Sequence, residues 1–184
     1  ADLQEADLSE GILIEACLEN CNLSEADLCE ADISGANLKN ARLHRTVLYR
    51  CRGEEVDFSN AILTQANLVE ANLSGANFSH ANLMESNIEG ANLTNTCFKD
   101  ANLSEVNLTG VFLSNANLLG ADFTNSECIA ADLAGCDLTG ANLHNTYLNH
   151  ADLSGANLKS ALNLTRDQVE TAFINKETQL PDSI

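Results

Sequence analysis

Histidine, cysteine and carboxylate side chains are the groups in this sequence that could bind a metal ion or act as acids, bases or nucleophiles. The chain has 4 His, 7 Cys and 27 Asp and Glu residues. The cysteines form no Cys-x-x-Cys pair, and the closest two, Cys17 and Cys21, match no strong zinc pattern. No G-x-S-x-G, Walker loop or G-x-G-x-x-G occurs. We therefore expect reduced thiols that pack as small apolar residues, no metal or cofactor, and no enzyme activity.

The charge of the chain narrows the classes of partner. Only 9 Lys and Arg residues oppose the acidic ones, which gives a net charge of −18. This balance argues against direct binding of nucleic acid or an anionic membrane through a basic surface. No stretch approaches the roughly 20 apolar residues of a membrane span, and no signal peptide is visible. We expect a cytoplasmic protein, with a leader removed before Ala1 as the alternative.

The carboxylates belong to a five-residue repeat that runs through most of the chain. Leu, Ile or Phe fills 30 of 32 positions spaced five apart from Leu3 to Leu158, and the exceptions are Gly53 and Cys128. Two residues before each of these positions stands Ala or another small residue, and between the two stands Asp or Asn in 22 of 32 repeats. Carboxylates that recur by rule are expected to be structural, not catalytic.

A period of five fits neither a regular helix nor a regular strand. An α-helix would rotate successive leucines by about 140°, and a strand would place alternate leucines on opposite faces. The leucines stay on one side only if three residues run extended and the next two turn a corner. The repeat therefore predicts an all-β solenoid with the Ala and Leu columns inside and Asp or Asn outside.

This pattern resembles the pentapeptide-repeat family over residues 1–160. The resemblance implies a right-handed quadrilateral β-helix with four pentapeptides per coil, and hence about eight coils. Phe58, Phe78 and Phe98, spaced by twenty, would then stack inside successive coils. No His would have a Cys or another His in its own column on a neighbouring coil, which argues against a metal site.

The coil formed by residues 41–60 departs most from the pattern. Gly53 would leave a hole in the core that costs about 2–5 kcal/mol if it stays unfilled. The coil also contains four of the five arginines: Arg42, Arg45, Arg50 and Arg52.

The arginines of this coil have two interpretations. The columns Glu30–Arg50–Glu70 and Glu25–Arg45 would pair cations with carboxylates and so relieve the repulsion of an acidic rod, with small energies per exposed pair. We favour this interpretation. The alternative is a docking site for an acidic partner.

Two sets of apolar residues are candidate interaction surfaces. Cys29, Tyr49 and Val69 share one outward column, and Val47 stands beside Tyr49. A contiguous set of this kind can mark a binding site for an unknown protein partner, although scattered surface apolar residues are normal. At the N-terminal end, the uncovered first coil offers a second surface, where self-association would make a homodimer through an end of the rod: Ile12, Leu13 and Ile14.

Residues 161–184 differ from the repeat and are expected to form a capping helix and tail. Thr165 and Gln168 form a capping box, and Leu164 and Val169 occupy the positions of a hydrophobic staple. Val169, Ala172 and Phe173 would share the core-facing side of a helix that ends near Asn175. This segment resembles the cap of many family members, notably cyanobacterial ones, and would cover the open end of the core.

The preferred function is that of a non-catalytic structural or protein-interaction scaffold. The family resemblance implies one alternative, a DNA mimic that binds DNA gyrase through an acidic rod. Residues 1–40 carry a net charge of −9 and residues 61–160 a charge of −8, but residues 41–60 sum to +1 and interrupt the acidic surface. The uneven charge therefore disfavours the DNA mimic.

Overall fold

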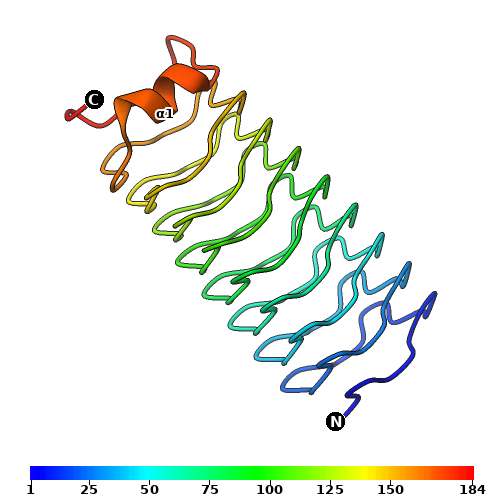
Figure 1. Ribbon diagram of the computed structural model, residues 1–184. Helices are drawn as coiled ribbons and strands as arrows, with labels where there is room; N and C mark the ends of the chain where they lie inside the picture. The colour runs from blue at the N-terminus through cyan, green and yellow to red at the C-terminus, as the bar shows by residue number, and fades with distance from the viewer.

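The computed structural model describes residues 1–184 as a straight rod of stacked coils, with the termini at opposite ends (Figure 1). Parallel backbone pairs join residues twenty apart, from Asp2 with Asn22 to Asn142 with Leu162. Each coil therefore contains four pentapeptides, and the expected right-handed quadrilateral β-helix is confirmed. Wall 1 begins with residues 1–5, and walls 2, 3 and 4 follow in order with five residues each. No helix is both long and apolar enough to cross a membrane.

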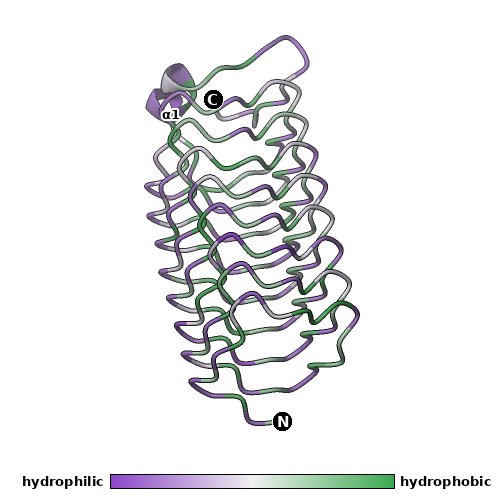
Figure 2. Cartoon of the chain, turned by 90° about the vertical axis from the view of Figure 1, so that its right-hand side faces the viewer, coloured by the Kyte–Doolittle hydropathy of each residue, from purple (hydrophilic) through white to green (hydrophobic).

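Backbone hydrogen bonds hold each coil to its neighbours and close each corner. The Leu3 N–H donates to the Asn22 carbonyl (2.7 Å), and the Asn22 N–H donates to the Ala1 carbonyl (3.0 Å). At the corner, the Ala6 N–H donates to the Leu3 carbonyl (3.1 Å). Only the second residue of each wall forms a bridge to the same position on the neighbouring coils, so the walls contain no longer strands. Hydrophobic and hydrophilic stretches alternate along every coil, because each pentapeptide has both inward and outward residues (Figure 2).

The fifth residue of every pentapeptide adopts a left-handed conformation. Glu5 has φ of 56° and Asn20 has φ of 57°, and the same holds at every fifth position through Ser160. A positive φ at the third residue of a hydrogen-bonded turn is the signature of a type II turn. Glycine fits this conformation best, but only eight of these positions hold Gly. The corners therefore depend on the coil-to-coil ladder to hold Glu, Asn and even Arg side chains in a disfavoured conformation.

Asp and Asn recur at the second position because their side chains complete the hydrogen bonding of the turn. The Ser9 N–H donates to Asp7 Oδ1 (3.1 Å), and the Val69 N–H donates to Asn67 Oδ1 (3.1 Å). Without such an acceptor, the N–H of the fourth residue would have no partner within the protein. Asn also donates to the coil below, as Asn92 Nδ2 does to Asn72 Oδ1 (2.9 Å). Asp and Asn can exchange because the acceptor oxygen is common to both.

The leucine column forms one continuous core. From Leu18 to Leu158, every third-position residue is buried, including Gly53 and Cys128. The Phe78 ring stacks on Phe58 with centroids 4.9 Å apart and on Phe98 with centroids 4.7 Å apart, which confirms the expected ladder. The ring spacing equals the separation of adjacent strands, so the three rings fill successive coils without a gap.

The C-terminal segment follows the coil path for a ninth turn, with α1 (Arg166–Thr171) in the place of wall 2. The capping box of Thr165 and Gln168 is confirmed, and the two staple residues are buried. The expected helix end near Asn175 is wrong, because α1 ends at Thr171. The chain then resumes wall 3, where Phe173 pairs with Asp152. Phe173 points outward and is 60% exposed, so its expected place on the core side of a helix is also wrong.

Candidate interaction surface

The four arginines of residues 41–60 divide into two groups. Arg50 Nε lies 2.6 Å from Glu70 Oε2, and Arg52 forms an ion pair of 3.2 Å with Asp32. Arg42 and Arg45 pair with no carboxylate. The expected Glu25–Arg45 pair is therefore wrong. Arg45 Nε instead donates to the neutral Gln65 Oε1 on the next coil (2.8 Å).

Gly53 leaves no hole in the core. A methyl group added to Gly53 would stand 2.8 Å from Leu73 Cδ2 and 3.0 Å from Ile33 Cγ1. These two side chains come from the coils above and below and occupy the space that a leucine would fill. The expected hole at Gly53 is therefore wrong.

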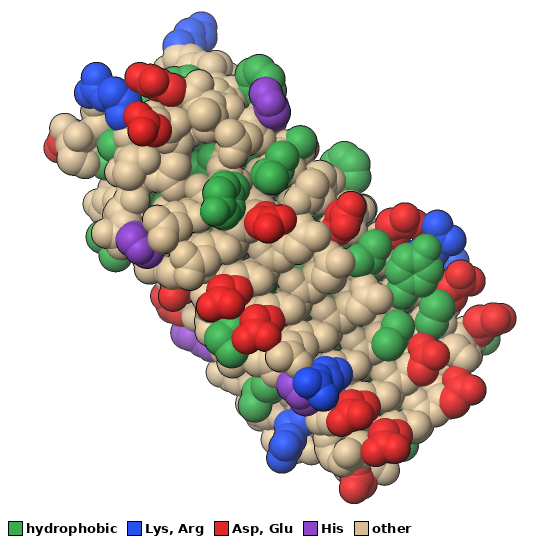
Figure 3. Space-filling view, viewed as in Figure 1, with side chains coloured by type: hydrophobic (Ala, Val, Ile, Leu, Met, Phe, Trp, Pro, Cys, Tyr) green, Lys and Arg blue, Asp and Glu red, His purple; other side chains and the backbone are tan.

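Wall 2 carries the apolar column expected from the sequence. Cys29, Val47, Tyr49 and Val69 are all half-buried, and we call these four residues the wall 2 patch. One face of the rod shows hydrophobic side chains among acidic and basic groups (Figure 3). The Arg50 guanidinium lies over the Tyr49 ring, 4.9 Å from its centroid. The arginine covers part of the ring, and the Tyr49 side chain as a whole is half-buried.

The cysteines differ in accessibility, and all seven are free thiols. Burial raises the pKa of the Cys51, Cys128 and Cys136 thiols to about 12. The pKa of Cys29 is also raised, first by desolvation and then by the nearby Asp27 and Glu30 carboxylates. Raised pKa values leave these thiols protonated near neutral pH, so they are poor nucleophiles.

The two ends of the rod differ. At the N-terminal end, Ile12 and Ile14 point outward from wall 3, with Ile12 81% exposed, while Leu13 packs against the core. At the C-terminal end, Leu164 and Val169 cover the last coil. Leucine side chains thus lie beneath the cap at one end and at the surface at the other.

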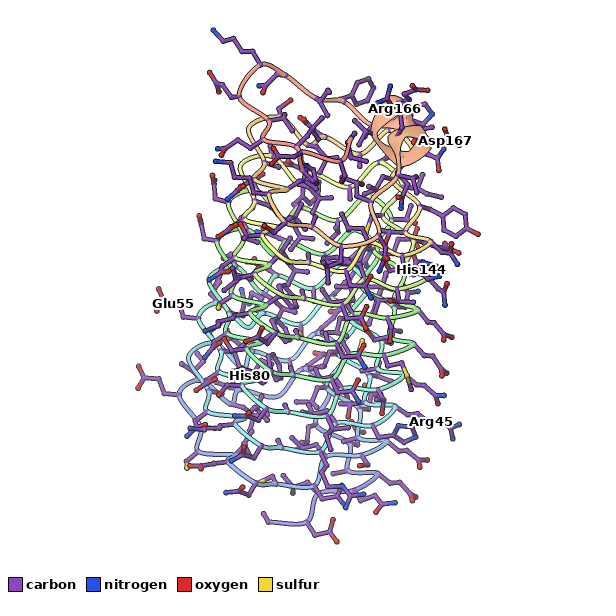
Figure 4. All side chains as sticks on the ribbon, turned by 90° about the vertical axis from the view of Figure 1, so that its left-hand side faces the viewer. Arg45, Glu55, His80, His144, Arg166 and Asp167 are labelled. Atoms are coloured by element: carbon purple, nitrogen blue, oxygen red, sulfur yellow. The ribbon has the colours of Figure 1, made fainter.

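A polar hollow of about 800 Å³ lies between α1 and the last full coil. Its lining includes His144, Tyr147, Asp167 and Gln168. The Gln168 amide donates to the carbonyls of Leu143 and Thr146, both at 2.8 Å, and so ties the helix to the coil below. His144 and Asp167 are on the same side of the rod as Arg45 (Figure 4) but form no hydrogen bond with each other. The hollow therefore holds no hydrogen-bonded acid–base pair.

The remaining chemistry-bearing side chains do not assemble into a site. No group of three His, Cys, Asp or Glu side chains is placed to hold a metal ion. His44 Nδ1 is 2.8 Å from the Thr64 hydroxyl, and His80 lies 3.8 Å from Asp100 across one coil. These contacts join neighbouring coils and serve the stacking of the rod.

Within residues 1–160, two exposed apolar side chains were missed by the sequence interpretation. Ile62 is 44% exposed and Phe112 is 51% exposed, and both occupy second positions that usually hold Asp or Asn. The signal was present in the repeat, because an apolar residue at an outward position must face solvent. Ile62 matters for the surface because it stands directly above Arg42 on wall 1.

Comparison with known proteins agrees with the observed coil. The family of pentapeptide repeats matches residues 1–45, 61–100, 101–140 and 126–165 in 8 copies. HetL from Nostoc sp. strain PCC 7120, a pentapeptide repeat protein involved in heterocyst differentiation regulation, is 27% identical, with a TM-score of 0.54 over 98% of this chain and 85% of HetL. No curated protein matches the sequence.

A second solved structure resembles the chain in fold alone. A trypsin-treated variant of QnrB1, a plasmid-mediated fluoroquinolone resistance protein, is 19% identical, with a TM-score of 0.70 over 87% of this chain and 82% of QnrB1. The family match covers most of the chain, and the coil has the geometry that its repeats require. The chain therefore belongs to the pentapeptide-repeat family.

Proposed function

We propose that this chain is a non-catalytic rod that binds another protein through the wall 2 patch. The observation that carries the proposal is the contiguity of Cys29, Val47, Tyr49 and Val69 on three successive coils of a wall whose other outward residues are mostly polar. Apolar side chains that are adjacent and partly exposed mark a protein contact far more often than isolated ones do. Tyrosine near arginine at the centre of a patch is also typical of residues that dominate interface energies.

Three further features support a binding role over a catalytic one. The interior is filled by the leucine column, the hollow beside α1 lacks an acid–base pair, and no metal cluster is present. The ladder of backbone hydrogen bonds between coils is complete along the four walls, so a partner cannot add a strand to a wall. Recognition by a wall therefore uses its side chains and the few N–H groups that lie outside this ladder.

The test is a pull-down from a lysate of the source organism with wild-type protein and two variants. Tyr49→Glu places a charge in the centre of the wall 2 patch. Tyr147→Glu makes the same change at an exposed tyrosine on wall 2, five coils away. We expect a partner that is lost with Tyr49→Glu and kept with Tyr147→Glu. A partner kept by both variants would contradict the assignment of the surface.

The acidic surface favours a second candidate, binding to DNA gyrase as a mimic of duplex DNA. The net charge of −18 and the likeness in fold to QnrB1 support it. The arginines of residues 41–60 oppose it, because they interrupt the acidic walls. A gyrase supercoiling assay separates the two candidates, and the absence of any effect at high micromolar protein would remove the second.

A further inference from the structure

Two cations at one edge of the rod have no neutralising carboxylate. Arg42 lies on wall 1, and Arg45 lies at the corner between walls 1 and 2, where it projects into solvent (Figure 4). The Gln65 amide accepts the hydrogen bond from Arg45 and donates its own N–H to Glu85 (2.7 Å), so Arg45 is linked to Glu85 only through a neutral group. Arg50 and Arg52, in contrast, each contact a carboxylate directly. Local pairing thus accounts for two of the four arginines and leaves two available.

Backbone donors without acceptors accompany these cations. Residues 41–60 hold Arg42, Val47 and Arg52 at three of the four second positions, where Asp or Asn would accept an N–H. The N–H groups of His44 and Tyr49 consequently donate to no group in the protein. On wall 2 the neighbouring coils differ, since the Cys29 N–H below and the Val69 N–H above each donate to a side-chain oxygen. On wall 1 the Ser24 N–H below His44 is bound in the same way, whereas the Thr64 N–H above it is also free. Unpaired backbone donors at a surface are ready to bind an oxygen acceptor from outside.

Apolar side chains lie on the same two walls as the cations and the free donors. Val47 and Tyr49 are half-buried on wall 2, and Ile62 is exposed on wall 1. We call the set Arg42, Arg45, Val47, Tyr49 and Ile62 the arginine corner. The family match stops at residue 45 and resumes at residue 61, so Val47 and Tyr49 lie in the unmatched stretch and the other three residues lie at its borders.

We propose that the arginine corner binds an acidic protein segment that carries apolar side chains next to its carboxylates. This proposal rests on the proposed function and names the chemistry of the partner. The partner's carboxylates pair with Arg42 and Arg45, and its oxygens accept the N–H groups of His44 and Tyr49, replacing the Asp or Asn that the coil lacks. Its apolar side chains pack on Val47, Tyr49 and Ile62.

A protein segment fits this surface better than a nucleic acid does. Glu25 lies one coil below Arg45 at the same corner, and the rod as a whole carries a net charge of −18. A nucleic acid carries a negative phosphate at every step of its backbone, so it would be repelled by these carboxylates along the contact. A short acidic segment can place carboxylates at the two arginines and apolar side chains elsewhere.

The experiment selects random twelve-residue peptides displayed on phage against the immobilised full-length rod. We expect the selected peptides to be enriched in Asp and Glu adjacent to apolar residues. The tightest peptide is then titrated by fluorescence polarisation against wild type and variants. The double variant Arg42→Glu with Arg45→Glu should bind at least tenfold more weakly. The matched control, Lys99→Glu with Lys159→Glu, makes the same charge change on wall 4 and should bind like wild type.

A second variant tests the free backbone donor without a change of charge. Val47→Asn restores the side-chain acceptor for the Tyr49 N–H and should weaken peptide binding while the fold is retained. In nitrogen–proton correlation spectra of wild type, the peptide should shift the Tyr49 and His44 amide signals downfield. The Ser104 amide, already bonded to Asn102 Oδ1 (3.0 Å), should not move.

The outcomes separate this proposal from the function on which it rests. Selected peptides without acidic enrichment, or binding that survives the double arginine variant, would overturn the acidic partner while leaving a protein-binding rod. A twelve-base-pair DNA duplex that binds as tightly as the peptide would also overturn it. If neither the selection nor the lysate yields any ligand of the wild-type rod, both proposals fail.

Discussion

Leu73 and Ile33 both reach into the space beside Gly53, so that a methyl group at Gly53 would come within 3.0 Å of both side chains. Because Gly53 has no side chain, the side chains of the two neighbouring coils can fill the core at this level of the rod. We expect Gly53→Ala to cost about 1 kcal/mol and Gly53→Leu up to about 3 kcal/mol, because both overpack the core. Urea unfolding monitored by circular dichroism measures the change. A Gly53→Leu variant more stable than wild type would show that the space was empty.

The phenylalanine ladder should contribute strongly to stability. Phe78 is fully buried between Phe58 and Phe98, so Phe78→Ala removes a ring with two stacked neighbours and should cost about 3–5 kcal/mol. The control is Phe112→Ala at an exposed ring, which should change the free energy of unfolding by less than about 0.5 kcal/mol. Equal losses for the two variants would contradict the assignment of the ladder to the core.

The pH dependence of stability should follow the buried thiols. A thiol of pKa about 12 in the folded state and 9.0 when free favours folding while it is protonated. Its contribution is complete below pH 9 and is lost as pH rises toward 12, because the unfolded chain releases the proton first. Thermal melts between these pH values should show that the midpoint falls as pH rises. The fall should be smaller for the double variant Cys51→Ala with Cys136→Ala than for wild type. A double variant with the same alkaline slope would contradict this explanation.

The cap should be held by Gln168 more than by the helix itself. Gln168→Ala removes two hydrogen bonds to the carbonyls of Leu143 and Thr146 as well as half of the capping box, and should cost about 1–3 kcal/mol. Hydrogen exchange of the last coil should accelerate, while exchange near Phe78 stays unchanged. Glu170→Ala, at an exposed position of the same helix, is the control. Unchanged exchange at Thr146 in the Gln168→Ala variant would refute the role.

The interior of the rod could be predicted from the sequence because the buried residues recur every five positions, a period that no regular helix or strand can produce. The leucine column and the phenylalanine ladder follow from that period, once the family resemblance supplies four walls. The helix end could not be predicted locally. Val169, Ala172 and Phe173 keep helical spacing, yet hydrogen bonds from the coil below bind Phe173 and draw the chain back into wall 3.

The surface was harder to predict than the core. Arg45 had a carboxylate below it and an amide above it in the same column, and the sequence does not decide which one a long exposed side chain contacts. The free N–H groups of His44 and Tyr49 were available from the pattern, but only once the Asp and Asn oxygens are known to accept the N–H two residues on. A residue other than Asp or Asn at the second position therefore changes the surface in two ways. It presents a different side chain, and it leaves the N–H two residues on without its usual acceptor.

The central claim is that residues 41–60 depart from the repeat for recognition and not for stability. The direct test is the thermal midpoint of a variant that restores the repeat, with Arg42→Asn, Val47→Asn and Arg52→Asn. Each restored acceptor should contribute about 0.5–1.5 kcal/mol, less the lost Val47 packing and Arg52–Asp32 pair, so the midpoint should rise by about 2–6 °C. A midpoint that falls by a similar amount would show that these residues stabilise the rod and would contradict the account.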